Sequence, residues 1–287
     1  MSSRKALAVK LTLNKPERWL LASVLLLVAV AVFGPHVQQP HTHDFADQRA
    51  WGAIPCALDV LSNLPFALWG VGGLASVLGR SPAGIKAEQH GLAALFFAGL
   101  VLTAGASAWY HWQLDDAGLA IDRLGMVVAF AGVVGLAAAD RVSARSGVAL
   151  AWLVLGAGAA SVGVWFTSGQ VLPWAVLQFG GMALVLSLAW ARPLPGSLAV
   201  RWGQLIAIYA VAKALEVADN AVFELTQQLV SGHSLKHVVA SLAAWPVLTA
   251  VLRCPGEKVG EQVEIEQNPA QLGARTSVTA DLPVHHQ

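Results

Sequence analysis

The chain has 287 residues, of which 56% are hydrophobic and only 12% are charged. Soluble domains carry about 25% charged residues, so this composition excludes an ordinary soluble protein and predicts an integral membrane protein. The formal net charge of +1 gives no sign of a nucleic-acid partner. The two cysteines, Cys56 and Cys254, lie far apart in the sequence and imply no disulfide framework.

Apolar segments long enough to cross a bilayer recur along the whole chain. A membrane-spanning helix needs about 20 mostly apolar residues, and short polar joints separate eight such segments here. They are Trp19–Phe33, Val60–Leu78, Gly91–Tyr110, Gly118–Ala139, Gly147–Phe166, Val171–Ala191, Trp202–Phe223 and Leu235–Leu252. The first is short and follows a basic stretch, so a signal peptide is an alternative, but "AVFGPHVQQ" offers no clean small-x-small cleavage site.

The distribution of Lys and Arg predicts the orientation. With a cytoplasmic N-terminus, fourteen of these residues fall in cytoplasmic joints, whereas only Arg49 and Lys236 fall in outer joints. Cytoplasmic loops carry the excess of positive charge, so the count predicts an all-α, multi-pass protein with eight spans and both termini in the cytoplasm. The polar tail, residues 255–287, lacks periodicity and is expected to be a disordered cytoplasmic extension.

Ionisable side chains inside these segments all fall in the outer half of the membrane under this topology. Such groups cost about 2.5–3.5 kcal/mol each on insertion scales, so they usually face a bundle interior and carry function. Ser62 and Asn63 fall in the same layer. The ionisable set is His111, Asp122, Lys213, Glu216, Asp219, His233 and His237.

Three of these residues are candidate metal ligands. His233 and His237 stand at positions i and i+4, on one face of a helix, and with His111 they match the three-histidine zinc sites that leave a fourth position open. Ser107 lies four residues before His111 and shares its face, while Asp122 can orient a histidine or accept a proton. An H-x-x-x-H pair by itself more often marks interfacial or core histidines.

Other polar and small residues admit structural interpretations. Lys213 and Glu216 are expected to form an ion pair at i, i+3, and Ser62 and Asn63 either serve the site or form hydrogen bonds between helices. Close packing of helices is expected at Gly70, Gly72 and Gly73.

The first outer loop, "PHVQQPHTHDFAD", contains histidines and carboxylates. Histidines in such a loop bind metal adventitiously more often than specifically. Asp44 and Asp47 could instead help to hold Ca²⁺ through oxygen ligands.

Five segments in order, "VLSNLPF", "SAWYH", "IDRLGM", "KALEVADNAVF" and "SGHSLKHVV", resemble the alkaline ceramidase family of seven-span zinc amidohydrolases, in its bacterial-type branch. Distant relatives of that family include the adiponectin-type receptors. The resemblance runs from about Asp44 to Leu252. It implies a seven-span hydrolase domain over residues 41–254, preceded by residues 1–40 with one additional helix.

The resemblance also implies roles for individual residues. His111, His233 and His237 would bind Zn²⁺, Ser107 would stabilise the developing oxyanion, and Asp122 would handle protons. Asp44 and Asp47 match, at a spacing of three, acidic positions of a calcium site in the animal enzymes. The next acidic position of that site falls near Asp59, out of register with it. Ser62, Asn63, Lys213, Glu216 and Asp219 would support the centre.

The implied reaction is hydrolysis of the amide that links a fatty acid to a sphingoid base, with a ceramide-like lipid substrate entering from the membrane. A zinc-containing lipid receptor of the same fold is an alternative, since both kinds of relative share these residues. A transporter would need ionisable groups through both halves of the membrane, and the inner half is bare. No protein partner is predicted. Compact loops suit a bacterial inner membrane with the site on the periplasmic side, whereas a eukaryotic host would place the protein in the endoplasmic reticulum or Golgi.

Overall fold

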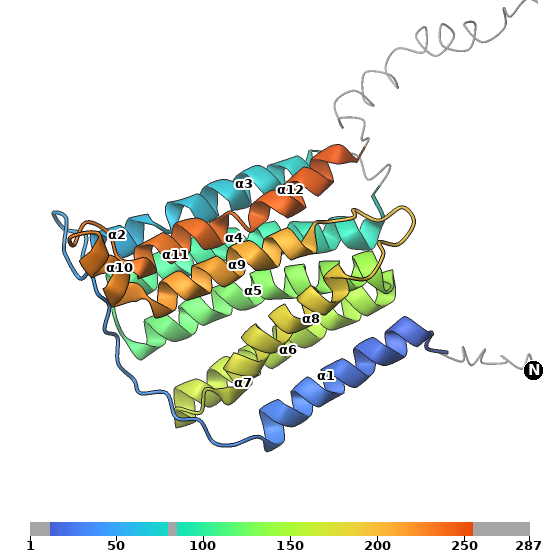
Figure 1. Ribbon diagram of the computed structural model, residues 1–287, viewed down its shortest axis with the longest axis horizontal. Coiled ribbons are helices and arrows are strands. Elements are labelled where there is room, and N and C mark those ends of the chain that lie inside the picture. Colours follow the sequence, from blue (N-terminus) through green and yellow to red (C-terminus); the bar gives the residue numbers. More distant parts are fainter. Residues whose placement is uncertain (1–11, 80–84, 255–287) are drawn as a thin grey trace, which may run out of the picture.

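The computed structural model describes residues 12–79 and 85–254. The predicted cytoplasmic tail, residues 255–287, and most of the basic N-terminal stretch lie outside the described residues. Within them the regular structure is helical throughout (Figure 1). The elements are α1 (Lys15–Phe33), α2 (Ala57–Leu61), α3 (Leu64–Leu78), α4 (Ala87–Trp112), α5 (Asp116–Arg141), α6 (Ala144–Ser168), α7 (Leu172–Ala175), η1 (Val176–Gly180), α8 (Gly181–Ala189), α9 (Trp202–Val217), α10 (Asp219–Leu225), α11 (Gly232–Ser241) and α12 (Ala244–Arg253).

Seven helical segments of the described chain are long and apolar enough to cross a membrane. They match seven of the eight predicted spans, so the all-α architecture is confirmed, and the length and composition of these helices suit a multi-pass membrane protein. The remaining predicted span, Trp202–Phe223, falls short because the helix is interrupted at Ala218 and α9 has only 16 residues. The count of eight spans and the orientation therefore stay predictions.

Several predicted spans are divided where the sequence contains proline. Proline lacks an N–H and its ring clashes with the preceding turn. The helix accordingly breaks between α2 and α3 just before Pro65, and between α11 and α12 shortly before Pro246. A five-residue π-helix, η1, follows α7 and its Pro173. Such π segments are frequent at functional sites.

Small residues let the central helices approach closely. A Cβ atom on Gly99 of α4 would lie 2.2 Å from the backbone N of Ala129, and one on Gly132 of α5 would lie 2.4 Å from the backbone N of Phe96. Gly70 and Gly73 of α3 also approach α4 closely, as predicted, since a Cβ atom on either would lie less than 3 Å from atoms of α4. A Cβ atom on Gly72, however, would have nothing within 4 Å, so the prediction of close packing is wrong there, because this face of α3 points away from α4.

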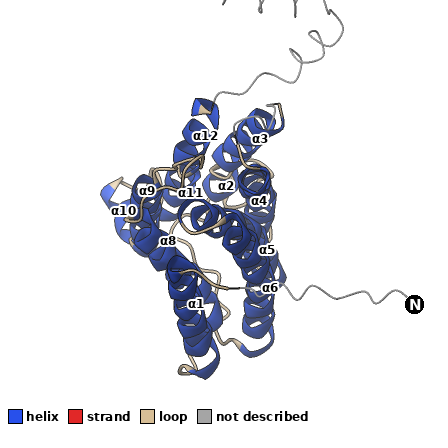
Figure 2. Ribbon diagram, turned by 90° about the vertical axis from the view of Figure 1, so that its right-hand side faces the viewer, coloured by secondary structure: helices blue, strands red, loops and turns tan. Residues whose placement is uncertain are grey.

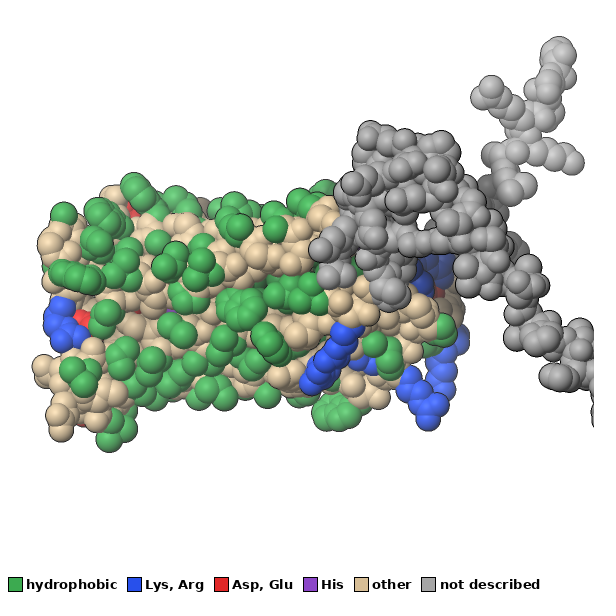
Figure 3. Space-filling view, turned by 90° about the horizontal axis from the view of Figure 1, so that it is seen from above, with side chains coloured by type: hydrophobic (Ala, Val, Ile, Leu, Met, Phe, Trp, Pro, Cys, Tyr) green, Lys and Arg blue, Asp and Glu red, His purple; other side chains and the backbone are tan. Residues whose placement is uncertain are grey.

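The flank of the bundle is apolar, as expected for a surface in contact with lipid. Figure 3 shows hydrophobic side chains along the bundle, with Lys and Arg mainly toward its ends. Helix α1 lies at one edge (Figure 2), and only 11% of its apolar window is buried. An ion pair secures it: Arg145 Nε donates to Glu17 Oε1 at 2.7 Å. Helix α1 is thus attached to the bundle and largely exposed along its length.

Candidate metal centre

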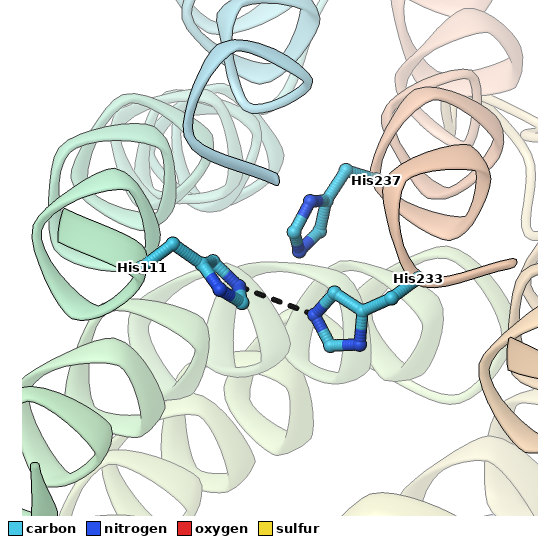
Figure 4. A group of neighbouring side chains, drawn as sticks. All are labelled: His111, His233 and His237. Carbon is cyan, nitrogen blue, oxygen red and sulfur yellow. Dashed lines mark hydrogen bonds between the residues drawn. The ribbon is translucent and has the colours of Figure 1, made fainter. Parts of the chain in front are cut away.

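Three buried histidines from two helices meet at one end of the bundle. His111 lies in the last turn of α4, and His233 and His237 lie in the first turns of α11 (Figure 4). One nitrogen of each ring lies within 4.8 Å of the others, and the Nε2 atoms of His111 and His233 are 3.1 Å apart. The three side chains singled out from the sequence as ligands are therefore neighbours in space.

The arrangement fits a small divalent cation. A tetrahedral ion with bonds of ~2.0–2.1 Å sets two nitrogen ligands about 3.3–3.4 Å apart, close to the separation of His111 and His233. The Ser62 hydroxyl lies 2.8 Å from His237 Nδ1, which leaves Nε2 of that ring for a cation. Such a partner fixes the tautomer of a ligating histidine. His111 Nδ1 has no equivalent partner among the described residues.

Local sequence explains why α11 starts where it does. Ser231 caps the helix, since its hydroxyl accepts from the backbone N–H of Ser234 at 3.0 Å. Gly232 follows, and a Cβ there would lie 2.3 Å from the carbonyl oxygen of Leu215 in α9. Asp219 Oδ1 accepts from the backbone N–H of His233 at 2.7 Å. These contacts fix the first turn of α11 against α9 and the start of α10, and thereby position both of its histidines.

The segment between α1 and α2, residues 34–56, covers the centre; we call it the outer segment. The Phe45 ring packs edge-on against the rings of His111 and His233, with centroids 4.8 and 4.4 Å away. The backbone N–H of Ala46 donates to Asp219 Oδ2 at 3.0 Å. Asp219, one of the predicted supporting residues, therefore binds α11 with one oxygen and the outer segment with the other.

The carboxylates proposed for calcium have separate environments. Asp44 is exposed. Asp47 is buried, and both of its oxygens accept from the Arg49 guanidinium at 2.7 Å, which holds the pKa of Asp47 below its ordinary value of 3.8. Among the described residues neither aspartate belongs to a group of three or more potential metal ligands. Of the loop histidines, His41 and His43 both contact Asp116.

Ser107 and Asp122 lie beside the histidine centre, and together with His237 they line one cavity. Both side chains are buried, at 3% and 9% exposure. The Ser107 hydroxyl forms a hydrogen bond with the Asp122 carboxylate, whereas Asp122 Oδ1 has no partner in the described part of the chain. The cavity therefore holds a hydroxyl and a carboxylate oxygen next to a potential metal ligand.

The cavity continues from this end into the apolar interior of the bundle. It encloses about 980 Å³ of space, counting its opening. Val133 and Val185 line it from the halves of α5 and α8 that lie away from the histidines. A polar pair lies in this part of its wall, where Gln178 Nε2 of the π-helix donates to the Tyr209 hydroxyl at 2.8 Å. Further apolar lining comes from Phe66, Phe96, Leu100, Met126, Phe130 and Met182.

The remaining supporting residues form two groups. The predicted pair of Lys213 and Glu216 is present, and Lys236 of α11 joins it, donating to Glu216 Oε1 at 2.9 Å. Asn63 is buried and donates through Nδ2 to the carbonyl oxygen of Asp59 at 2.8 Å.

Three contributors to the site were missed from the sequence. Lys236 was counted only as a loop residue, although it stands next to His237. Asp59 is fully buried, and its Oδ1 accepts from the Ser234 hydroxyl at 2.5 Å; its position three residues before Ser62, within one helical turn, was an available signal. For Phe45 the sequence contained no such signal, because an aromatic residue in a polar loop does not reveal what it packs against.

Neither a protein-family model nor a curated protein matches this chain.

Proposed function

We propose that this protein is a metal-dependent amidohydrolase of the alkaline ceramidase type, which cleaves the N-acyl amide of ceramide-like membrane lipids to a fatty acid and a sphingoid base. The observation that carries the proposal is the cavity: a buried three-histidine cluster, a serine and an aspartate lie at one end of a largely apolar cavity. A lipid amide needs both parts, since its acyl chain is apolar and its amide is polar.

The metal is proposed to be Zn²⁺, held by His111, His233 and His237. Three neutral imidazoles without a carboxylate are a known ligand set for catalytic zinc. When bound, such an ion activates water at neutral pH and polarises a carbonyl group. The Ser62 hydroxyl at 2.8 Å from His237 Nδ1 keeps that ring oriented for binding.

The protein's own side chains supply the remaining steps. Ser107 donates its hydroxyl to the carbonyl oxygen as negative charge develops there, once Asp122 has taken up a proton and no longer holds that hydroxyl. Asp122 accepts a proton from the attacking water and delivers it to the amide nitrogen, so that the amine leaves neutral. The unpartnered Oδ1 of Asp122 supports this role, because it has an acceptor position to spare.

The apolar wall favours a lipid over a water-soluble amide. An acyl chain in the cavity contacts apolar side chains in place of lipid, whereas a short water-soluble amide would leave most of this wall without a partner. The outer segment, with Phe45 against two of the imidazoles, covers the centre. We propose residence in a bacterial inner membrane, with the centre toward the periplasm and membrane lipids as the source of substrate.

The test combines metal analysis with fatty-acid release from N-acyl sphingoid lipids, using the full chain purified in detergent. We expect about one zinc ion per chain, as for other three-histidine sites, and release that is lost together with the metal in His237→Ala. The control is His90→Ala, because His90 lies in the first turn of α4 and contacts the carbonyl oxygen of Val77. Metal without release from any N-acyl lipid would favour a lipid receptor of the same architecture. Wild-type protein without metal would refute the site.

A further inference from the structure

The wall of the cavity carries a charged group that hydrolysis of a neutral amide does not require. Lys213 and Glu216 of α9 and Lys236 of α11 all line the cavity that contains Ser107, Asp122 and His237. We call these three residues the lysine cluster. Lys236 Nζ donates to Glu216 Oε1 at 2.9 Å, and Lys213 pairs with the other oxygen of the same carboxylate.

The lysine cluster has one positive charge in excess, because two ammonium groups share one carboxylate. A single lysine would suffice to neutralise Glu216, and a second cation beside an apolar chamber carries a desolvation cost without a structural return. Asp122 also lines the cavity and interacts electrostatically with Lys236, but in the described part of the chain the ion pair of Lys236 is with Glu216. The second ammonium group is therefore available to an anionic group of a ligand.

Both ammonium groups have donor capacity left for such an anion. An ammonium has three N–H donors, and each lysine makes one hydrogen bond to Glu216. The Lys236 and Lys213 side chains are 19% and 23% exposed, respectively. Lys213 Nζ also lies 5.6 Å from the centre of the Phe179 ring, within the range of a cation–π contact.

The position of the lysine cluster identifies the part of the ligand that it would contact. Lys236 precedes His237 in α11, so the cluster lies on the wall next to the histidine centre. The apolar lining continues past it, away from the histidines, and accommodates an acyl chain. A group at the lysine cluster thus lies near the amide, and because a fatty acyl chain carries no charge, an anion there would belong to the amine portion of the substrate.

We propose, on the basis of the function above, that Lys213 and Lys236 bind an anionic group carried by the amine portion of the substrate. The substrates are then N-acyl lipids with a carboxylate or a phosphate close to the scissile amide. Both anions accept charge-assisted hydrogen bonds from ammonium groups. A carboxylate would come from an N-acyl amino acid, and a phosphate from a phosphorylated amino alcohol.

Binding of lipids that contain no amide tests this inference separately from catalysis. Three probes share one alkyl ether chain and differ in the terminal group: 2-alkoxyethanol is neutral, alkoxyacetate carries a carboxylate, and 2-alkoxyethyl phosphate carries a phosphate. Their affinities for the full-length, metal-containing protein in detergent are measured by displacement of a fluorescent fatty acid. We expect at least one anionic probe to bind about tenfold or more tightly than the alcohol. The better of the two identifies the source of the anion.

Variants assign the preference to the lysine cluster. Lys236→Met and Lys213→Met are expected to reduce the preference for the anionic probe several-fold and to leave binding of the alcohol unchanged. Glu216→Gln is expected to act in the opposite direction, because it removes the competing carboxylate. The matched control is Lys86→Met, since Lys86 donates to the carbonyl oxygen of Pro195 outside the cavity. The opposite signs keep the test informative if one lysine variant fails to fold.

Equal binding of all three probes to the wild-type protein would overturn the inference, as would a preference that survives in both lysine variants. Anion preference without release from any N-acyl lipid would leave the anion site standing and refute the amidohydrolase. Release from neutral ceramide without any anion preference would support the amidohydrolase and refute the anion site.

Discussion

The Ser62 hydroxyl shows how one polar atom prepares a histidine for a cation. It donates to the carbonyl oxygen of Asp59 at 3.1 Å and lies 2.8 Å from His237 Nδ1. Because its one proton is used on Asp59, the hydroxyl oxygen accepts from Nδ1–H, and the lone pair of His237 is then on Nε2, facing the other imidazoles. The helix is interrupted at Ser62 and Asn63, which the following Pro65 favours, and this interruption allows the contact.

Ser107 and Asp122 can be separated from metal binding by substitution. Ser107→Ala is expected to lower the single-turnover rate of fatty-acid release about 10²–10³-fold, the usual effect of removing an oxyanion donor. Asp122→Asn is expected to lower it about 10²–10⁴-fold through loss of proton transfer. Metal content should stay at the wild-type level in both variants, because neither residue is a ligand.

Ser76→Ala provides the control for this pair. Ser76 is a half-buried residue of α3 that does not line the cavity and donates to the carbonyl oxygen of Gly72, so its removal should leave the rate unchanged. A wild-type rate in Ser107→Ala would remove the oxyanion role from Ser107. Loss of metal in either variant would indicate a structural role in place of a chemical one.

At the scale of elements, the contact between α4 and α5 determines how His111 and Asp122 face each other. Gly132→Ala would place a methyl group 2.4 Å from the Phe96 backbone, so we expect a loss of about 1–3 kcal/mol in stability from overpacking. Gly156→Ala is the matched change, because Gly156 has open space around it. It should be neutral or stabilising by up to about 1 kcal/mol, through helix propensity.

Unfolding of the two alanine variants in detergent by heat or denaturant measures this difference. Equal stability of the two would show that α4 and α5 can move apart at no cost. The packing would then not be what holds the two sides of the centre in place.

The helices could be predicted because apolar runs of this length are unambiguous, whereas their interruptions could not. The run Trp202–Phe223 reads as one span, yet it breaks at Ala218, where α10 begins with Asp219. Asp219 satisfies hydrogen bonds to two separate segments, and such long-range contacts leave no periodic trace in a sequence. The grouping of the three histidines was predictable because two share a helix face and the third lies at the same depth.

At the scale of the whole molecule, the number of spans decides on which side each loop lies. Between the outer segment and the α10–α11 turn, the predicted topology contains six crossings, the last of them formed by α9 and α10. We therefore expect single cysteines at Gln48 and Gln228, both exposed, to react with a membrane-impermeant maleimide from the outside of intact cells. Ala191→Cys should react only after permeabilisation.

The parent chain without an added cysteine is the control, since Cys56 and Cys254 are already present. Labelling of Gln48→Cys and Gln228→Cys from opposite sides would mean that α9 and α10 do not cross. Labelling of both from the inside would invert the predicted orientation.

The two oxygens of Asp219 tie metal binding to the order of a loop. One holds the first turn of α11, which carries His233, and the other holds the outer segment beside Phe45. A cation that draws the imidazoles together also favours the arrangement in which Asp219 holds both partners. Coupling of this kind is reciprocal in free energy: whatever loosens residues 34–56 must weaken the hold on the cation by the same factor, and loss of the cation must loosen that segment in turn.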